Sequence, residues 1–233
     1  NSLEYDINYF DYDILSPNGP QKHQLRAYQG WIDNNYRGLF EHATGTYKTA
    51  TGLLCADHYL GENKNVVISA PLQIIAQNWY DLIDKCFDSQ ISVIRCWSEN
   101  SNWKSDLADV VDRGKKVILI FVTNSLWKQE GIDALRILRN KYLLIADEAH
   151  NWDRPDARLF LEKNEPFARI ALTAKLSEPG EEEKTAHILK YFAFGHQLFI
   201  DSLSLENAIS MGFLRKYHYE LKQIDIDFDS TGN

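Results

Sequence analysis

The sequence predicts an α/β fold built on a mostly parallel sheet with helices on both faces. Short, continuously apolar runs of strand length recur along the chain, which is typical of strands that are buried on both faces. Stretches of helical length separate these runs, and this alternation favours a parallel sheet. Polar loops follow several of the runs, at the carboxyl ends of strands where such folds bind their ligands.

The apolar runs are the predicted strands, and each is followed by a turn or a polar loop. They cover residues 38–42, 66–71, 91–96, 117–122, 142–146 and 168–172. The stretches between them show helical periodicity, beginning with an amphipathic segment before the first strand. The predicted helices cover residues 25–32, 48–59, 73–86, 103–113 and 125–138, then a stretch after the acidic residues 181–183, and residues 204–212. A further strand is expected at residues 217–221.

Charge and cysteine content exclude several classes of protein. The 233 residues include 25 Lys and Arg against 33 Asp and Glu, so the net charge is −8. This excludes a generically basic nucleic-acid binder but not a local basic groove, because binding follows the local field. The three scattered cysteines match neither a zinc site nor a secreted disulfide scaffold, so we expect a reduced, cytoplasmic protein.

Two features of the chain bear on its setting in the cell. No apolar run approaches the length that spans a bilayer, so no membrane association is expected. The chain has a single methionine, Met211, and residue 1 is Asn1, so we expect a fragment of a longer protein.

A loop that follows the first predicted strand has the composition of a phosphate-binding loop. Such a loop presents backbone N–H groups and a helix N-terminus to the anion, with a Lys for the phosphates and a Ser or Thr for Mg²⁺. Gly45, Lys48 and Thr49 fit these roles. The standard pattern also has Gly where His42 and Tyr47 stand. An incidental Lys-Thr pair at the start of a helix therefore stays open as the alternative.

A second polar loop, Asp147-Glu148-Ala149-His150, directly follows a predicted buried strand. Two neighbouring carboxylates at this position fit one that holds Mg²⁺ and one that polarises an attacking water molecule. His150 would bridge the nucleotide site to a neighbouring loop. The alternative is a helix N-terminus that carries acidic residues. The position after a buried strand, about a hundred residues beyond the first loop, favours the functional interpretation.

These motifs resemble the first RecA-like domain of superfamily 2 helicases and translocases, the DEAD/DEAH group. The most similar branch includes the type I/III restriction enzyme motor subunits and the phospholipase-D-linked helicases. The resemblance covers about Leu25 to Leu214 and keeps the family order. It includes the element Leu25-Arg26-Ala27-Tyr28-Gln29, the loops described above, and Leu172-Thr173-Ala174, which resembles the family's third motif. It implies a RecA-like P-loop domain with a mostly parallel sheet.

The resemblance implies that the domain uses ATP and Mg²⁺. The residues that it implies for ATP binding are Arg26, Gln29, Thr44, Gly45, Thr46, Tyr47, Lys48 and Thr49. Within this set, Gln29 with Arg26 would recognise adenine, and Lys48 would neutralise the β- and γ-phosphates. Thr49 and Asp147 would hold Mg²⁺, and Glu148 would orient water. The implied catalytic residues are Lys48, Asp147, Glu148 and His150.

The resemblance also implies a nucleic-acid partner and further protein partners. DNA, single- or double-stranded, would run across Pro71 and across Thr123 and Asn124. A second RecA-like domain would supply the catalytic arginine, and a nuclease module or subunit would accompany the motor. Residues 1–24 are then an N-terminal extension, 25–214 the motor domain, and 215–233 the start of a linker. We expect weak ATPase activity, or none, from this part alone.

Two departures from the family pattern leave a rival function open. Tyr47 replaces a loop glycine and would be strained if its φ is positive, and Lys175 follows the third motif where the family has Thr. Both are compatible with a non-hydrolysing module that binds DNA or a partner protein. A P-loop kinase or GTPase is disfavoured by the Arg26–Gln29 element and by His150. Among the tryptophans, Trp31 and Trp79 are expected in the core.

Overall fold

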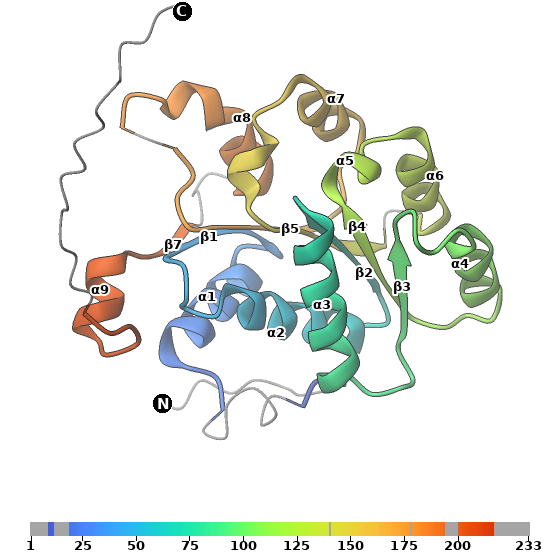
Figure 1. Cartoon of the computed structure of the whole chain (residues 1–233), viewed down its shortest axis with the longest axis horizontal. Helices are drawn as coiled ribbons and strands as arrows, with labels where there is room; N and C mark the ends of the chain where they lie inside the picture. Colours follow the sequence, from blue (N-terminus) through green and yellow to red (C-terminus); the bar gives the residue numbers. More distant parts are fainter. Residues whose placement is uncertain (1–8, 12–18, 140, 178, 194–199, 217–233) are drawn as a thin grey trace, which may run out of the picture.

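The computed structural model describes residues 9–11, 19–139, 141–177, 179–193 and 200–216 (Figure 1). At its centre lies a seven-stranded sheet with the strand order β3-β4-β2-β5-β6-β1-β7. Every neighbouring pair in this order is parallel. The α/β fold class predicted from the sequence is therefore confirmed, and the carboxyl ends of all these strands lie at one edge of the sheet.

Most strand boundaries agree with the sequence prediction to within one residue. The strands are β1 (Arg37–His42), β2 (Asn65–Ala70), β3 (Ser92–Cys96), β4 (Val117–Val122), β5 (Tyr142–Ala146), β6 (Ala168–Thr173) and β7 (Ile200–Leu203). Strand β7 was not predicted. It has four residues, pairs with β1 alone among the described strands, and alternates exposed with buried positions, so it lacks the continuous apolar run of the central strands.

The helices also follow the prediction, with three differences. They are α1 (Lys22–Asp33), α2 (Lys48–Gly61), α3 (Gln73–Cys86), α4 (Trp103–Asp112), α5 (Thr123–Leu126), α6 (Gln129–Ile137), η2 (Ala149–Trp152), α7 (Pro155–Lys163), α8 (Glu182–Phe192) and α9 (Leu205–Ser210). Helix α1 begins earlier than expected, and at its start the side chain of Gln24 accepts a hydrogen bond from the backbone N–H of Gln21 at 2.8 Å. The predicted helix at 125–138 is split into α5 and α6, and α7 was not predicted.

The predicted strand at residues 217–221 lies outside the described residues. The same holds for most of the N-terminal extension proposed for residues 1–24.

The helices cover the two faces of the sheet in separate groups, with α1, α2 and α3 on one side and α5 to α8 on the other (Figure 1). Alternate strand residues supply the two cores. Val66 and Ile68 of β2 pack with α1–α3, whereas Val67 between them packs with α4–α8. This burial on both faces explains why the central strands are apolar at every position.

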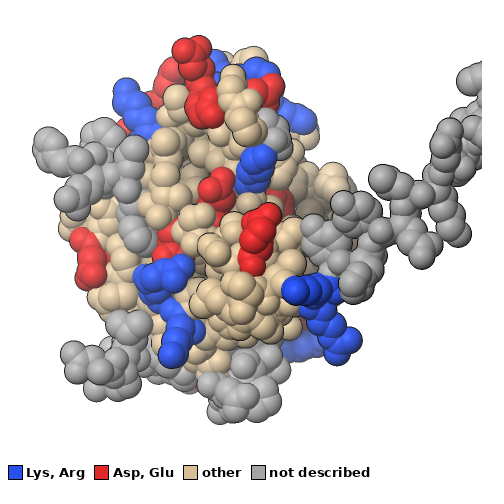
Figure 2. Space-filling view, turned by 90° about the vertical axis from the view of Figure 1, so that its left-hand side faces the viewer, with Lys and Arg blue, Asp and Glu red and all other residues tan. Residues whose placement is uncertain are grey.

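The tryptophans expected in the core are buried there. Trp31 and Trp79 lie in the α1–α3 layer, and Trp152 is equally buried in the other layer. On the face shown in Figure 2, acidic and basic side chains are interspersed, and the described residues form no continuous basic surface there. No helix among the described residues is long and apolar enough to span a membrane.

Candidate nucleotide site

The loop between β1 and α2 turns twice through the left-handed region of backbone conformation. Gly45 has φ +85°, which glycine adopts without a steric penalty. Tyr47 has φ 60° and ψ 43° directly before α2, and its side chain is 63% exposed. A non-glycine residue at such a position costs on the order of 1–3 kcal/mol. The strain expected at Tyr47 is therefore present in the structure.

Lys48 begins α2, and its side chain folds back into the loop. Its Nζ donates a hydrogen bond to the carbonyl oxygen of His42, at 3.0 Å, and only 9% of the residue is exposed. Burial lowers the pKa of Lys48, and the nearby carboxylates of Glu148 and Asp147 partly offset this effect. The first N–H groups of α2 have no partner inside the helix by their position.

The acidic loop after β5 is anchored to the core through Asp147. One carboxylate oxygen accepts a hydrogen bond from the indole N–H of Trp79 at 2.8 Å, and the other accepts from the N–H of Glu148 at 2.9 Å. Burial raises the pKa of Asp147 despite these hydrogen bonds. Glu148 itself has φ 49°, a second strained position among the predicted site residues. A cation would relieve the cost of the buried carboxylate at Asp147.

His150 connects this loop to the end of β6. Its Nδ1 lies 3.1 Å from the hydroxyl of Thr173, and that hydroxyl donates to the carbonyl of Lys175 at 2.8 Å. The Thr173 oxygen therefore accepts from Nδ1–H, and Nε2 is left to accept from the amide of Asn151 at 3.2 Å. These contacts place a proton on Nδ1 of His150, which also lies 3.4 Å from a carboxylate oxygen of Glu148. The predicted bridge between the second and third motifs is thus present as a hydrogen bond.

A cavity of about 630 Å³ is lined by residues that were predicted to bind two different ligands, the nucleotide and the nucleic acid. Thr44, Glu148 and His150 line it from the nucleotide loops. The residues assigned to the nucleic acid, Pro71, Thr123 and Asn124, line it from the loops after β2 and β4. All of these positions follow the carboxyl ends of their strands, as the fold class predicts.

The nucleic-acid residues differ in how far they are accessible. Asn124 is exposed, whereas Thr123 is 3% exposed and its hydroxyl pairs with that of Ser69 at 2.8 Å. Thr123 is therefore placed to shape the loop rather than to present its hydroxyl. The exposed Arg154 lines the same cavity and was missed by the sequence analysis. Its only signal in the sequence was its position shortly after the acidic loop.

Helix α1 contacts the loop between β1 and α2 through His23 and Gln24, for which no role was predicted. His23 Nε2 lies 3.1 Å from the carbonyl of Thr46, and the Gln24 amide donates to the carbonyl of Tyr47 at 3.3 Å. The predicted adenine-binding residues lie further along the helix. The Gln29 amide donates to Asp33 at 2.9 Å, and Arg26 is engaged with β7.

Asp201 of β7 holds Arg26 and His42 together. It accepts from Arg26 at 2.6 and 2.9 Å and from His42 Nε2 at 2.7 Å. Burial by itself would raise the pKa of Asp201, but the hydrogen bonds from Arg26 and His42 outweigh it and the pKa is lowered. His42, at the position of a glycine in the standard pattern, thus has a definite structural partner.

The segment after α9 packs against the same loop. The Phe213 ring lies 4.8 Å from the ring of His23, and a Cβ atom at Gly45 would come within 3.0 Å of Leu214. Residues from both ends of the described chain therefore surround the phosphate-binding loop. Sequence patterns gave no sign of these contacts.

Comparison with known proteins agrees with the motifs and their arrangement. The family model described as type III restriction enzyme, res subunit, matches residues 16–178, which is well over half of the chain. The chain belongs to this family. Its resemblance to superfamily 2 helicase motor domains is thereby confirmed, and the family is one of helicase-like ATPase motor domains. No curated protein matches the chain.

Two solved structures share the fold at low sequence identity. The helicase domain of Hef from Pyrococcus furiosus is 18% identical, with a TM-score of 0.70 over 91% of this chain and 44% of that chain. The Sulfolobus solfataricus SWI2/SNF2 ATPase core in complex with dsDNA is 14% identical, with a TM-score of 0.60 over 84% of this chain and 38% of that one. The chain thus spans less than half the length of either protein.

Proposed function

We propose that this chain is the first motor domain of an ATP-dependent DNA helicase or translocase that works with a nuclease module or subunit, in restriction or DNA repair. The observation that carries the proposal is the grouping of Lys48, Asp147 and Glu148 at the carboxyl edge of one sheet. The two carboxylates act electrostatically on the buried Lys48, which requires the two loops to lie close together. Family membership supports the same assignment.

The buried charges fit a nucleotide with Mg²⁺. Lys48 would exchange its hydrogen bond to the His42 carbonyl for the β- and γ-phosphates of ATP, and the N-terminus of α2 would bind the same phosphates. Thr49 and Asp147 would hold Mg²⁺, because both Asp147 oxygens keep lone pairs beyond their present hydrogen bonds. When bound, Mg²⁺ neutralises charge on the phosphates.

The remaining residues would orient water and transmit the state of the nucleotide site. Glu148, held in its strained conformation, would orient the attacking water. His150 would couple this loop to Thr173 at the end of β6 through their hydrogen bond. DNA phosphates would bind across Pro71 and Asn124, with Arg154 as an additional cation, because these residues line the cavity that reaches Thr44. A second RecA-like domain would complete the site.

Titration calorimetry with Mg·ATP tests the nucleotide part of this proposal. We expect the chain to bind Mg·ATP, and we expect Lys48→Ala to abolish binding. Lys85→Ala removes an exposed lysine from α3 and serves as the control. Retention of wild-type affinity by Lys48→Ala would show that the loop does not bind phosphate.

Fluorescence anisotropy with a labelled duplex tests the DNA part separately. We expect weak binding that falls as salt rises, because the net charge is −8 and the contacts are to phosphates. Arg154→Ala should weaken binding about equally for different sequences. Tight binding that does not respond to salt would contradict the proposed phosphate contacts.

Two observations favour a second candidate function, a non-hydrolysing helicase-like module that binds DNA or a partner protein. The exposed Tyr47 side chain and the packing of Leu214 against Gly45 both restrict space around the phosphate-binding loop. Under this alternative, DNA binding persists while nucleotide binding stays undetectable, even after Tyr47 is replaced by glycine.

A further inference from the structure

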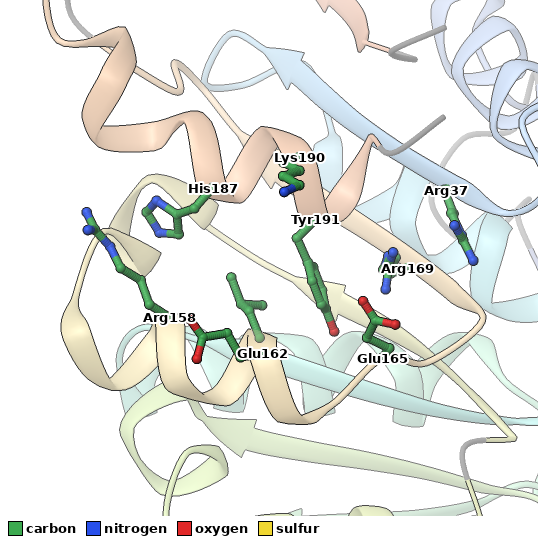
Figure 3. A pocket seen from close by; sticks show the side chains of 9 residues that line it. Arg37, Arg158, Glu162, Glu165, Arg169, His187, Lys190 and Tyr191 are labelled. Carbon is green, nitrogen blue, oxygen red and sulfur yellow. The ribbon is translucent and has the colours of Figure 1, made fainter. Parts of the chain in front are cut away.

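A second cavity, of about 500 Å³, lies at the opposite end of the sheet from the nucleotide loops (Figure 3). Its walls are α7, α8 and the first residues of β1 and β6. Strands of this length measure roughly 15–20 Å, so the cavity is separate from the proposed ATP and DNA sites. Cavities of 300–1,000 Å³ are the usual size for small-molecule sites.

Two arginines sit side by side in this cavity. Arg37 of β1 and Arg169 of β6 are direct partners in the register of the parallel pair. They lie on the sheet face covered by α4–α8, because Leu39 and Ala171, two residues further along each strand, belong to that core. Like charges directly opposite one another in a sheet destabilise it.

Arg169 is buried without a full set of partners. It is 3% exposed, and its guanidinium lies 4.1 Å from the centre of the Tyr191 ring. One terminal N–H donates to the Pro166 carbonyl at 3.4 Å, whereas Nε has no hydrogen-bond partner. Burial lowers the pKa of Arg169 and Arg37 lowers it further, although Tyr191 and Glu165 partly offset these effects. A buried, unsatisfied guanidinium N–H costs free energy unless an acceptor reaches it.

The acidic residues of the cavity do not supply that acceptor. Glu162 and Glu165 are exposed, and neither forms a salt bridge with a described residue at 4.0 Å or less. Figure 3 shows Glu165 on the same side of Tyr191 as Arg169. Lys190 of α8 adds another cation to the wall. The cavity therefore holds more positive than negative charge in a chain whose net charge is −8.

We propose that this cavity binds a small molecule through an oxyanion, a phosphate or carboxylate group placed against Arg169, Arg37 and Lys190. Guanidinium groups match both oxyanions geometrically, and two of them beside a lysine favour a doubly charged group. Tyr191 and Leu161 supply an apolar wall for the rest of the ligand. The Glu165 carboxylate forms no salt bridge with Arg169 but acts on it at longer range, and it would therefore oppose a bound anion.

Thermal unfolding in inorganic phosphate, against chloride at equal ionic strength, tests this site. All measurements use a Lys48→Ala background, so that the phosphate-binding loop does not contribute. We expect phosphate at ten times its Kd to raise Tm by about 3–5 °C. Arg169→Met should remove this rise. Because replacing a buried arginine can also affect folding, Lys190→Met on the exposed wall provides a second variant, which should weaken phosphate binding at least threefold.

Glu165→Gln gives the sharper test because its expected effect has the opposite sign. Removal of this carboxylate should tighten phosphate binding several-fold, which a purely structural role for these charges would not produce. An equal rise in Tm in every variant would be a general salt effect and would overturn the proposal. So would Arg169-dependent binding of a short DNA oligonucleotide with no response to free phosphate or to a dicarboxylate.

Discussion

At the carboxyl end of the sheet Lys48 is buried beside two carboxylates, whereas at the amino end Arg169 is buried beside a second arginine. Burial lowers the pKa of both cations. Around Lys48 the charges of Asp147 and Glu148 partly offset the cost of burial. Around Arg169 the neighbouring Arg37 adds to that cost, while Tyr191 and Glu165 partly offset it. The two sites therefore differ in their charged neighbours, because Arg169 has a second cation beside it and Lys48 has two carboxylates.

This difference indicates different ligands. At the carboxyl end, an added phosphate would be repelled by Asp147 and Glu148 unless a metal ion came with it, which fits Mg·ATP. At the amino end, an anion alone would relieve the repulsion between the two arginines. Each site contains a buried cation, and the charges of the neighbouring residues determine which ligand would bind there.

The largest expected effect is that of Lys48→Met, which should change the nucleotide site and leave the cavity at the amino end of the sheet unchanged. We expect this variant to lose nucleotide affinity about 100-fold, or about 2.7 kcal/mol, because the phosphates lose their buried cation. The domain itself should become more stable by about 1 kcal/mol, because a desolvated charge is removed. Titration calorimetry and urea unfolding measure the two quantities, with Lys85→Met as the exposed control. If Lys48→Met leaves the phosphate-induced rise in Tm unchanged, the two sites are independent, as we expect. Loss of that rise in Lys48→Met would contradict the existence of a separate anion site at the amino end.

Asp201→Ala tests how much the contacts between β7 and the nucleotide end of the sheet contribute to the free energy of unfolding. The change leaves His42 and Arg26 without their carboxylate, and we expect a loss of about 2 kcal/mol in the free energy of unfolding. Because the pKa of Asp201 is lowered on folding, its contribution is present above its usual value of 3.8 and is lost as pH falls through the folded value. Urea unfolding at neutral pH and in acid checks both statements. Asp109→Ala, an exposed position on α4, should be neutral.

Tyr47→Gly tests whether the strained loop residue limits nucleotide binding. Glycine removes both the positive-φ cost and the side chain near the phosphates, so we expect affinity for Mg·ATP to rise about tenfold. Tyr47→Ala keeps most of the backbone cost and removes only the ring, which separates strain from crowding. Calorimetry that finds no binding even for Tyr47→Gly would favour the non-hydrolysing module.

The smallest expected effect is the acid response of His23, which lies beneath the nucleotide loop. Burial lowers the pKa of His23, so the folded state resists protonation that the unfolded chain accepts below its ordinary value of 6.5. We expect stability to fall by up to about 1 kcal/mol between pH 6.5 and 5. His23→Gln should reduce this fall, as measured by urea unfolding. An identical pH response in His23→Gln would assign the effect to other groups.

Much of the central fold could be predicted from the sequence because burial on both faces requires continuous apolar strands. β4 and β5 occur with the predicted boundaries, and α3 does as well. The edge strand β7 and helix α7 were missed because a half-exposed edge and an amphipathic surface segment leave weak patterns. The split between α5 and α6 was also missed.

The sequence by itself determined which residues form the two nucleotide loops, because their chemistry follows buried strands at fixed positions. Lys48 and Asp147 could be identified as candidate site residues from the sequence alone. Tertiary structure decided what surrounds them: the indole of Trp79 on Asp147, His23 beneath Thr46, and the contacts of Asp201. It also decided that Arg37 and Arg169, which are far apart along the chain, become neighbours. Such contacts depend on strand order and register, which join distant segments and leave no local pattern in the sequence.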